Sequence, residues 1–241
     1  MRKKARKTGR TQETIAESDT PPEAPAQRVF LLSPANSAGE RMALVLSPRA
    51  RFALAHSVQG QGAPIGEVFA FASGLYFRGK LAYARCFARP PEGVPGALVI
   101  APGAGLVPPD VAVRADDLRA FGAVPVDAAD PRFRLPLERD ARLLADRLGP
   151  RADVVLLGSI ASPKYVEPLL AILGSRLVFP LDFVGRGDMS RGGLMLRAVR
   201  AGVELGYGPV EGAVRRGTRP PRLPPLPRAP GGSGDGGFRS G

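Results

Sequence analysis

Short apolar runs alternate with longer segments of helical periodicity from residue 28 to residue 204. The runs are apolar on both faces, as expected of strands buried in a sheet, and they cover 28–33, 96–101, 153–157 and 176–179. The other segments place apolar residues three or four positions apart, which predicts helices at 40–46, 115–121, 135–148, 164–173 and 189–203. Residues 64–88 have the same spacing and predict a helix that is interrupted at 73–74 and at Gly79. Strands that are each followed by a helix indicate a three-layer α/β fold, with a mostly parallel sheet of four to five strands between two layers of helices.

The two ends of the chain lack this pattern. Residues 1–27 are charged and rich in Thr, Glu and Pro, while residues 215–241 are rich in Pro and Arg and then in Gly and Ser. Such compositions are typical of disordered segments. We therefore predict a single α/β domain over 28–214 between two disordered tails.

The positive charge lies mainly on these tails. Of the formal net charge of +12, residues 1–28 carry +3, residues 215–241 carry +5 and the middle carries +4. A basic tail can anchor nucleic acid without regard to its sequence. However, 29 of the 34 basic residues are Arg, which also fits a compositional bias. The composition leaves both readings open.

Several kinds of chemistry are excluded by residue counts. Cys86 and His56 are the only residues of their types, so an internal disulfide and a His/Cys zinc cluster are impossible. A Ser-His-Asp or Cys-His mechanism would have to use His56, which falls in a segment that resembles a loop. No apolar run approaches the ~20 residues that span a bilayer, and no apolar stretch follows the basic N-terminus. We expect a cytoplasmic protein that needs no metal, cofactor or membrane; its oligomeric state is open.

Polar residues gather in the loops that follow the predicted strands. These loops read SPANSAG, PGAGLVPPD, GSIASPK and FVGRGDMSRGG. Ligands of open parallel sheets bind outside the carboxyl ends of the strands, so we expect the four loops to converge on one site. Hydrogen-bonding groups there would come from Ser33, Asn36, Ser159 and Tyr165.

The last of these loops leads into a predicted helix. It matches neither a dinucleotide fingerprint nor a Walker loop. Glycines at a helix N-terminus nevertheless favour an anion, and Arg186 and Arg191 could bind a phosphate or carboxylate. Asp188 and Ser190 are either helix caps or functional groups. Gly192 and Gly193, which are costly inside a helix, suggest close packing against the sheet.

Two further positions offer chemistry. Tyr76, Lys80 and Tyr83 are spaced by four and three residues, so they share one helical face if Gly79 does not reset the phase. Lys80 is one of two lysines within 28–214, and it is either an anion ligand or a surface lysine. Asp110 is either a turn residue or a functional carboxylate.

Five motifs in order, over residues 28–204, resemble the YaaA peroxide-stress family of bacteria and its shorter uncharacterised relatives. The stretches that carry the resemblance are LSPANS, GLYFRGKLAYA, PGAGLVPPD with the following DDL, LLGSIASPKYVEPL and GRGDMSRGGLML. The chain differs from the family pattern at Asn36, which replaces a lysine, at Asp188, which replaces an apolar residue, and at Lys164, which replaces a glutamate. The resemblance implies an α/β fold, DNA binding and a link to oxidative stress, but no defined reaction.

Three hypotheses follow. The leading one is a protein that binds nucleic acid or a nucleotide at the carboxyl ends of the strands, and its candidate ligands are Arg186, Arg191, Ser190, Lys80, Ser33, Asn36, Tyr76, Ser159, Lys164 and Tyr165. The second is an enzyme that acts on a nucleobase or a glycosidic bond, with Asp188 or Asp110 as general base or electrostatic stabiliser. The third is a protein that binds a small molecule or acts as a scaffold without catalysis.

Overall fold

A computed structural model of the chain describes residues 26–37, 39–215, 217–221, 223 and 224. We predict disordered tails over residues 1–27 and 215–241. Residues 1–25 and 225–241, which form most of these tails, lie outside the described ranges. No helix within the described ranges is both long and apolar enough to cross a membrane.

The centre of the fold is a six-stranded sheet in the order β4-β3-β1-β6-β7-β8. Its strands are β1 (Arg28–Leu32), β3 (Ala97–Ala101), β4 (Gly105–Val107), β6 (Asp153–Leu157), β7 (Leu177–Pro180) and β8 (Tyr207–Pro209). The four inner strands are parallel and match the predicted ones, whereas β4 and β8 are antiparallel edges. The edge strands were not predicted because they are three residues long and contain Gly or Pro.

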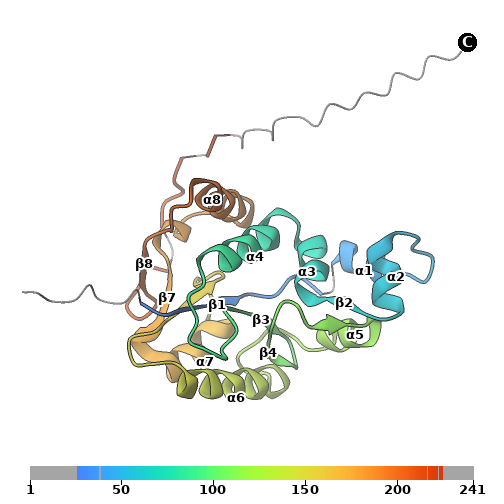
Figure 1. Cartoon of the computed structure of the whole chain (residues 1–241), viewed down its shortest axis with the longest axis horizontal. Coiled ribbons are helices and arrows are strands. Elements are labelled where there is room, and N and C mark those ends of the chain that lie inside the picture. The colour runs from blue at the N-terminus through green and yellow to red at the C-terminus, as the bar shows by residue number, and fades with distance from the viewer. Residues whose placement is uncertain (1–25, 38, 216, 222, 225–241) are drawn as a thin grey trace, which may run out of the picture.

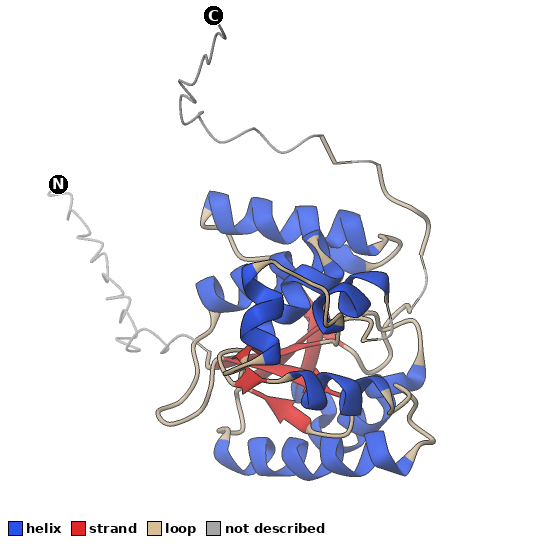
Figure 2. Cartoon of the chain, turned by 90° about the vertical axis from the view of Figure 1, so that its right-hand side faces the viewer, coloured by secondary structure: helices blue, strands red, loops and turns tan. Residues whose placement is uncertain are grey.

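Helices cover both faces of this sheet, as predicted (Figures 1 and 2). Helices α4 (Leu75–Phe87) and α8 (Asp188–Ala201) lie over one face, and α6 (Pro131–Arg147) and α7 (Pro163–Leu173) lie over the other. Alternate residues of β1 point to opposite layers: Phe30 and Leu32 belong to the core on the α4 side, while Val29 and Leu31 belong to the core on the α6 side. Both faces of each inner strand are therefore buried, which explains the continuous apolar runs.

The remaining elements are short, and most of them lie together on the right of Figure 1. They are α1 (Glu40–Leu46), α2 (Ala53–Gln59), β2 (Ala63–Pro64), α3 (Ile65–Ser73), β5 (Ala112–Val113), α5 (Ala115–Gly122), and the 3-10 turns η1 (Gly174–Arg176) and η2 (Leu181–Phe183). Strands β2 and β5 form a separate antiparallel pair. The prediction was wrong for α2, where a loop was expected and an exposed His56 lies in a two-turn helix.

Two glycines bring α4 and α8 into close contact. A Cβ on Gly79 would lie 2.7 Å from the carbonyl oxygen of Gly192, and a Cβ on Gly192 would lie 2.7 Å from the carbonyl oxygen of Leu75. The prediction of a break at Gly79 was therefore wrong, because this glycine lies within α4 and serves helix packing. The break is at Gly74 alone, where φ is +60°. Gly192 packs against α4 rather than against the sheet, and the first turns of α8 consequently lie on the first turns of α4.

Candidate functional site

The candidate site lies where the paths leaving β1 and β6 separate. The chain leaves β1 toward the α4 layer on its way to β3, and it leaves β6 toward α7 on the opposite face. Such a switch point is where open α/β sheets bind ligands. Ser33 follows β1 directly, and its backbone N–H donates to the carbonyl oxygen of Leu157 at the end of β6 over 3.2 Å.

Lys80 is the central side chain of this site. It is fully buried, and its Nζ donates to the carbonyl oxygen of Ser33 at 2.7 Å and to Ser33 Oγ at 2.9 Å. The amine lies 4.3 Å from the ring centre of Tyr76 and 4.8 Å from that of Phe77. Burial lowers the pKa of Lys80 to about 7, and the charges of Asp188 and Arg191 act on it in opposite directions. Lys80 is thus not a surface lysine, and near neutral pH it is a mixture of ammonium and amine.

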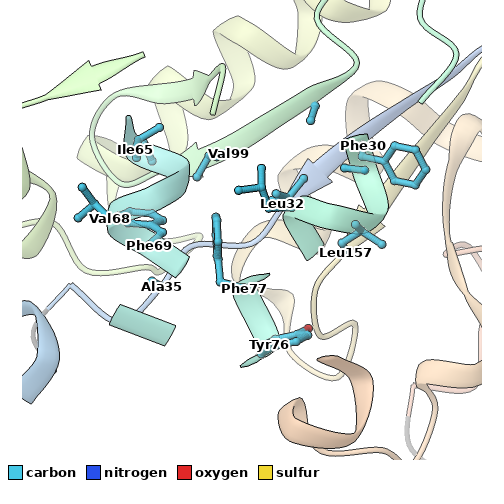
Figure 3. Close-up of a cluster of buried hydrophobic side chains, with 14 of the residues drawn as sticks. Phe30, Leu32, Ala35, Ile65, Val68, Phe69, Tyr76, Phe77, Val99 and Leu157 are labelled. Carbon is cyan, nitrogen blue, oxygen red and sulfur yellow. The ribbon is translucent and has the colours of Figure 1, made fainter. Parts of the chain in front are cut away.

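Two buried tyrosines accompany Lys80. The hydroxyl of Tyr165 accepts a hydrogen bond from the backbone N–H of Ser159 over 3.1 Å. The hydroxyl of Tyr76 has no well-formed hydrogen bond to the described residues, although Arg191 lies close enough to it to lower its pKa. Burial raises the pKa of both phenols, so both stay protonated at neutral pH. Figure 3 shows Tyr76 at the margin of the α4-side core.

Gly158 lets these groups come together. A Cβ at this position would lie 2.9 Å from Ser33 Cβ and 3.1 Å from the hydroxyl oxygen of Tyr165. Any larger residue would therefore separate the ends of β1 and β6 from Tyr165. The glycine that opens the predicted loop after β6 has a packing role that its sequence context did not reveal.

The first turn of α8 closes the site toward solvent. Arg191, whose side chain is 11% exposed, donates through Nε and Nη2 to the carbonyl oxygen of Phe183 at 3.2 and 3.1 Å. Its Nη1 lies 3.5 Å from Oδ1 of Asp188, whose side chain is 66% exposed. Both charges act on Lys80, Tyr76 and Tyr165. Arg191 and Asp188 are therefore the charged groups of α8 that act on the buried amine.

Neither polar candidate at the start of α8 caps the helix. The N-cap is Gly187, which makes no side-chain hydrogen bond. The hydroxyl of Ser190 instead accepts a hydrogen bond from Arg186 Nη1 at 3.3 Å. The capping interpretation of Asp188 and Ser190 was therefore wrong, and both remain available as functional groups.

An open groove of about 380 Å³ lies between α8 and residues 219–221, 223 and 224. Arg186, Ser190, Arg197 and Arg219 line it, and Arg186 and Arg197 also donate to the carbonyl oxygens of Pro221 and Pro224. Arg186 thus belongs to the groove and not to the group around Lys80. Sequence reasoning missed Arg197, although Ser190, Gly193 and Arg197 are spaced by three and four residues and so share one helical face.

Three other candidates lie outside the buried group. Asn36 is exposed in the loop after β1, and Lys164 is exposed on the first turn of α7. Asp110 is 73% exposed and pairs with Arg85 near the end of α4, at 2.5 Å. Because β4 runs antiparallel to β3, it leads the chain away from the carboxyl ends of the parallel strands before Asp110 is reached. The expected convergence of the loops thus fails for PGAGLVPPD, and Asp110 is a surface ion-pair residue.

The described part of the chain contains no group of three or more His, Cys, Asp or Glu side chains that could hold a metal ion. Comparison of the sequence with protein-family models, and of the chain with curated proteins and with solved structures, found no significant match.

Proposed function

We propose that this protein binds a nucleotide unit of a nucleic acid at the carboxyl ends of β1 and β6. The observation that carries the proposal is the buried Tyr76 hydroxyl, which lies beside Lys80 and Arg191 at the switch point of the sheet and has no well-formed hydrogen bond to the described residues. An unpaired buried hydroxyl costs about 1–3 kcal/mol. A bound ligand that accepts its proton would recover this free energy.

The charges around this hydroxyl favour an anionic ligand. Arg191 and the N-terminus of α8 both offer donors there, and guanidinium groups and helix N-termini are common phosphate ligands. Asp188 repels an anion, but its exposed side chain can move away from Arg191, because a partly exposed ion pair contributes little free energy. A phosphate at the mouth of the site would then replace Asp188 as the partner of Arg191.

The neighbouring groove favours a nucleic acid over a free nucleotide. Arg186, Arg197 and Arg219 line it next to the same helix N-terminus, and basic grooves bind the phosphate backbone on both sides of a recognised nucleotide. The chain's net charge of +12 would speed the encounter with such a polyanion.

Membership in the YaaA family, with a role in oxidative stress inside the cytoplasm, is part of this proposal. It is supported by the placement of four of the five motifs that carry the resemblance. Ser33, Lys80, Tyr165 and Arg191 come from these four motifs and lie together, although they are far apart in the sequence.

Binding of a fluorescent single-stranded oligonucleotide, measured by anisotropy, tests the proposal. Tyr76→Phe should weaken binding by about tenfold, because one hydrogen bond to a charged group is lost. The same variant should be as stable as the wild type or more stable, because it buries no unpaired hydroxyl. Arg191→Gln should weaken binding as well, while Arg142→Gln on the opposite face of the sheet should not.

The affinity should also fall steeply with salt, since counterions are released on binding. Affinities that are equal for the wild type, Tyr76→Phe and Arg191→Gln, or no binding by any of them, would refute the proposal. The second outcome would favour a scaffold protein instead.

A second function, catalysis on a nucleobase or a glycosidic bond, is favoured by the charge of Asp188 at the mouth of the site. This carboxylate acts electrostatically on Lys80 and on both buried tyrosines, so it could serve as general base or stabilise a developing cation. Asp188→Asn separates the two functions, because an enzyme would lose turnover while binding persists.

A further inference from the structure

We propose that Lys80 is a nucleophile that forms an imine with the aldehyde of a phosphorylated sugar, and that this sugar is the ring-opened deoxyribose of an abasic nucleotide. The inference rests on the proposed function, since the phosphate would occupy the anion site near Arg191. It adds a covalent reaction and a substrate class to what is so far a binding site.

The position of the amine is fixed for attack. Nζ donates two hydrogen bonds to Ser33, and the rings of Tyr76 and Phe77 pack over it. A protonated lysine has three N–H groups and a neutral amine has two. The two hydrogen bonds to Ser33 therefore satisfy both N–H groups of a neutral amine and leave its lone pair free to react.

The surroundings of Lys80 favour this neutral form. The side chain is fully removed from solvent, and Arg191 on α8 is a second cation whose charge acts on it. Burial and a neighbouring cation are the two conditions that activate lysine nucleophiles. Asp188 opposes them, but its side chain is largely exposed. The pKa of about 7 that results leaves about half of the amine unprotonated at neutral pH.

Tyr76 supplies the proton that the reaction needs. Its hydroxyl is buried and makes no well-formed hydrogen bond within the described part of the chain, and its ring already covers the amine. Burial raises its pKa, so the phenol is protonated at neutral pH, and the neighbouring charge of Arg191, which lowers this pKa, favours release of the proton to the leaving oxygen. Its role explains why an unpaired hydroxyl is buried here.

The reaction balances without an oxidant or a reductant. The lone pair of Nζ attacks the aldehyde carbon, and one proton passes from Nζ to the carbonyl oxygen to give a carbinolamine. The carbon–oxygen bond then breaks, the oxygen leaves as water with the proton from Tyr76, and a carbon–nitrogen double bond forms. The nitrogen gives its remaining proton to the Tyr76 phenolate, which restores the phenol. The net change is amine plus aldehyde to imine plus water, and hydrolysis reverses it.

The sugar would enter from the side of Asp188 and Arg191. Lys80 has no exposed surface, so a neighbouring side chain must move before an aldehyde can reach the amine, and we assign this movement to Arg191, whose charge acts on Lys80. Arg191 is held by the carbonyl oxygen of Phe183 and by exposed Asp188. A phosphate that draws Arg191 outward would therefore open the site to its own sugar.

Reductive trapping tests this inference. The wild-type protein is incubated with deoxyribose 5-phosphate and sodium cyanoborohydride, which converts an imine into a stable secondary amine, and the modified lysine is located by peptide mass spectrometry. We expect Lys80 to be labelled at least about tenfold faster than Lys164 at neutral pH, because an ordinary lysine with a pKa of about 10.4 is almost entirely protonated there. Labelling of Lys80 should level off above about pH 7.

Three variants refine the test. Lys80→Arg should abolish the fast labelling, Lys164→Arg should leave it unchanged, and Tyr76→Phe should slow it by about a hundredfold if the phenol is the proton donor. Equal labelling of Lys80 and Lys164 in the wild type would overturn the inference, whether or not the variants fold. Equally fast labelling by phosphate-free deoxyribose would overturn the role of the phosphate.

An oligonucleotide with a tetrahydrofuran abasic analogue, which has no aldehyde, separates this inference from the proposed function. Binding of this oligonucleotide without labelling of Lys80 by the sugar phosphate would overturn the inference alone. Selective labelling of Lys80 without binding of the oligonucleotide would overturn the proposed function and support aldehyde chemistry on a small sugar phosphate.

Discussion

Replacing Lys80 by Met should change how the stability of the protein depends on pH. The amine is fully buried in the folded chain, where its pKa is about 7, and it is exposed to water in the unfolded chain, where the ordinary value is 10.5. Met keeps an unbranched side chain of similar length but cannot titrate. The variant therefore isolates the contribution of this one group.

The sign and size of the effect follow from proton linkage. Between about pH 7 and about pH 10.5 the unfolded chain binds a proton at Lys80 that the folded chain has released, so stability rises with pH. The difference between the two pKa values, at about 1.36 kcal/mol for each pH unit, corresponds to about 5 kcal/mol in total. Integrated from about pH 7 to about pH 9, the contribution is about 2 kcal/mol.

Urea unfolding at several pH values measures this contribution. The free energy of unfolding of the wild type, minus that of Lys80→Met, should increase by about 2 kcal/mol between about pH 7 and about pH 9. Lys164→Met serves as the control, because this lysine is exposed, and its difference from the wild type should stay constant. Parallel pH curves for the wild type and Lys80→Met would refute the burial of the amine and with it the reasoning about its reactivity.

Further predictions concern packing, the core and the groove. Gly192→Ala should lower the free energy of unfolding by about 1–3 kcal/mol in urea titrations, because its Cβ would lie 2.7 Å from a backbone oxygen of α4. Gly206→Ala is the control: a Cβ at this position would have no neighbouring atom within 4 Å, and the free energy of unfolding should change by less than about 0.5 kcal/mol. Tyr83→Phe should lower the free energy of unfolding by about 1–3 kcal/mol, because the buried Tyr83 hydroxyl forms a hydrogen bond of 2.6 Å with the hydroxyl of Tyr207. Thermal unfolding measures this loss, and an unchanged melting temperature would contradict it. Arg186→Ala should reduce the slope of log affinity against log salt by about one in anisotropy titrations, and an unchanged slope would exclude a phosphate contact at this residue.

Much of the secondary structure could be predicted from local patterns. Helix α1 and strand β6 were predicted with their observed bounds, and the other inner strands and longer helices differ mainly at their ends. The reason is physical: a strand buried on both faces must be apolar throughout, and a helix on a sheet must be apolar on one side. The face shared by Tyr76, Lys80 and Tyr83 was also predictable, because the helix continues through Gly79.

The chemistry of these side chains depended on contacts between distant segments. The pKa of Lys80 is lowered mainly by burial and is modified by the charges of Asp188 and Arg191, while Ser33, which is 47 residues away, holds the amine in place. The exclusion of Asp110 depended on β4, a strand of three residues that reverses the chain.

The sequence by itself determined the layers of this protein, because periodicity and apolar runs are properties of neighbouring residues. Only the tertiary structure decided which polar residues meet. Gly79 and Gly192 allow α4 and α8 to approach closely, and Gly158 allows the ends of β1 and β6 to approach Tyr165. Beside these contacts Lys80 is fully buried, and the Tyr76 hydroxyl is buried without a well-formed hydrogen bond to the described residues. A glycine in a sequence does not reveal which backbone will approach it, and that approach decides which side chains surround Lys80.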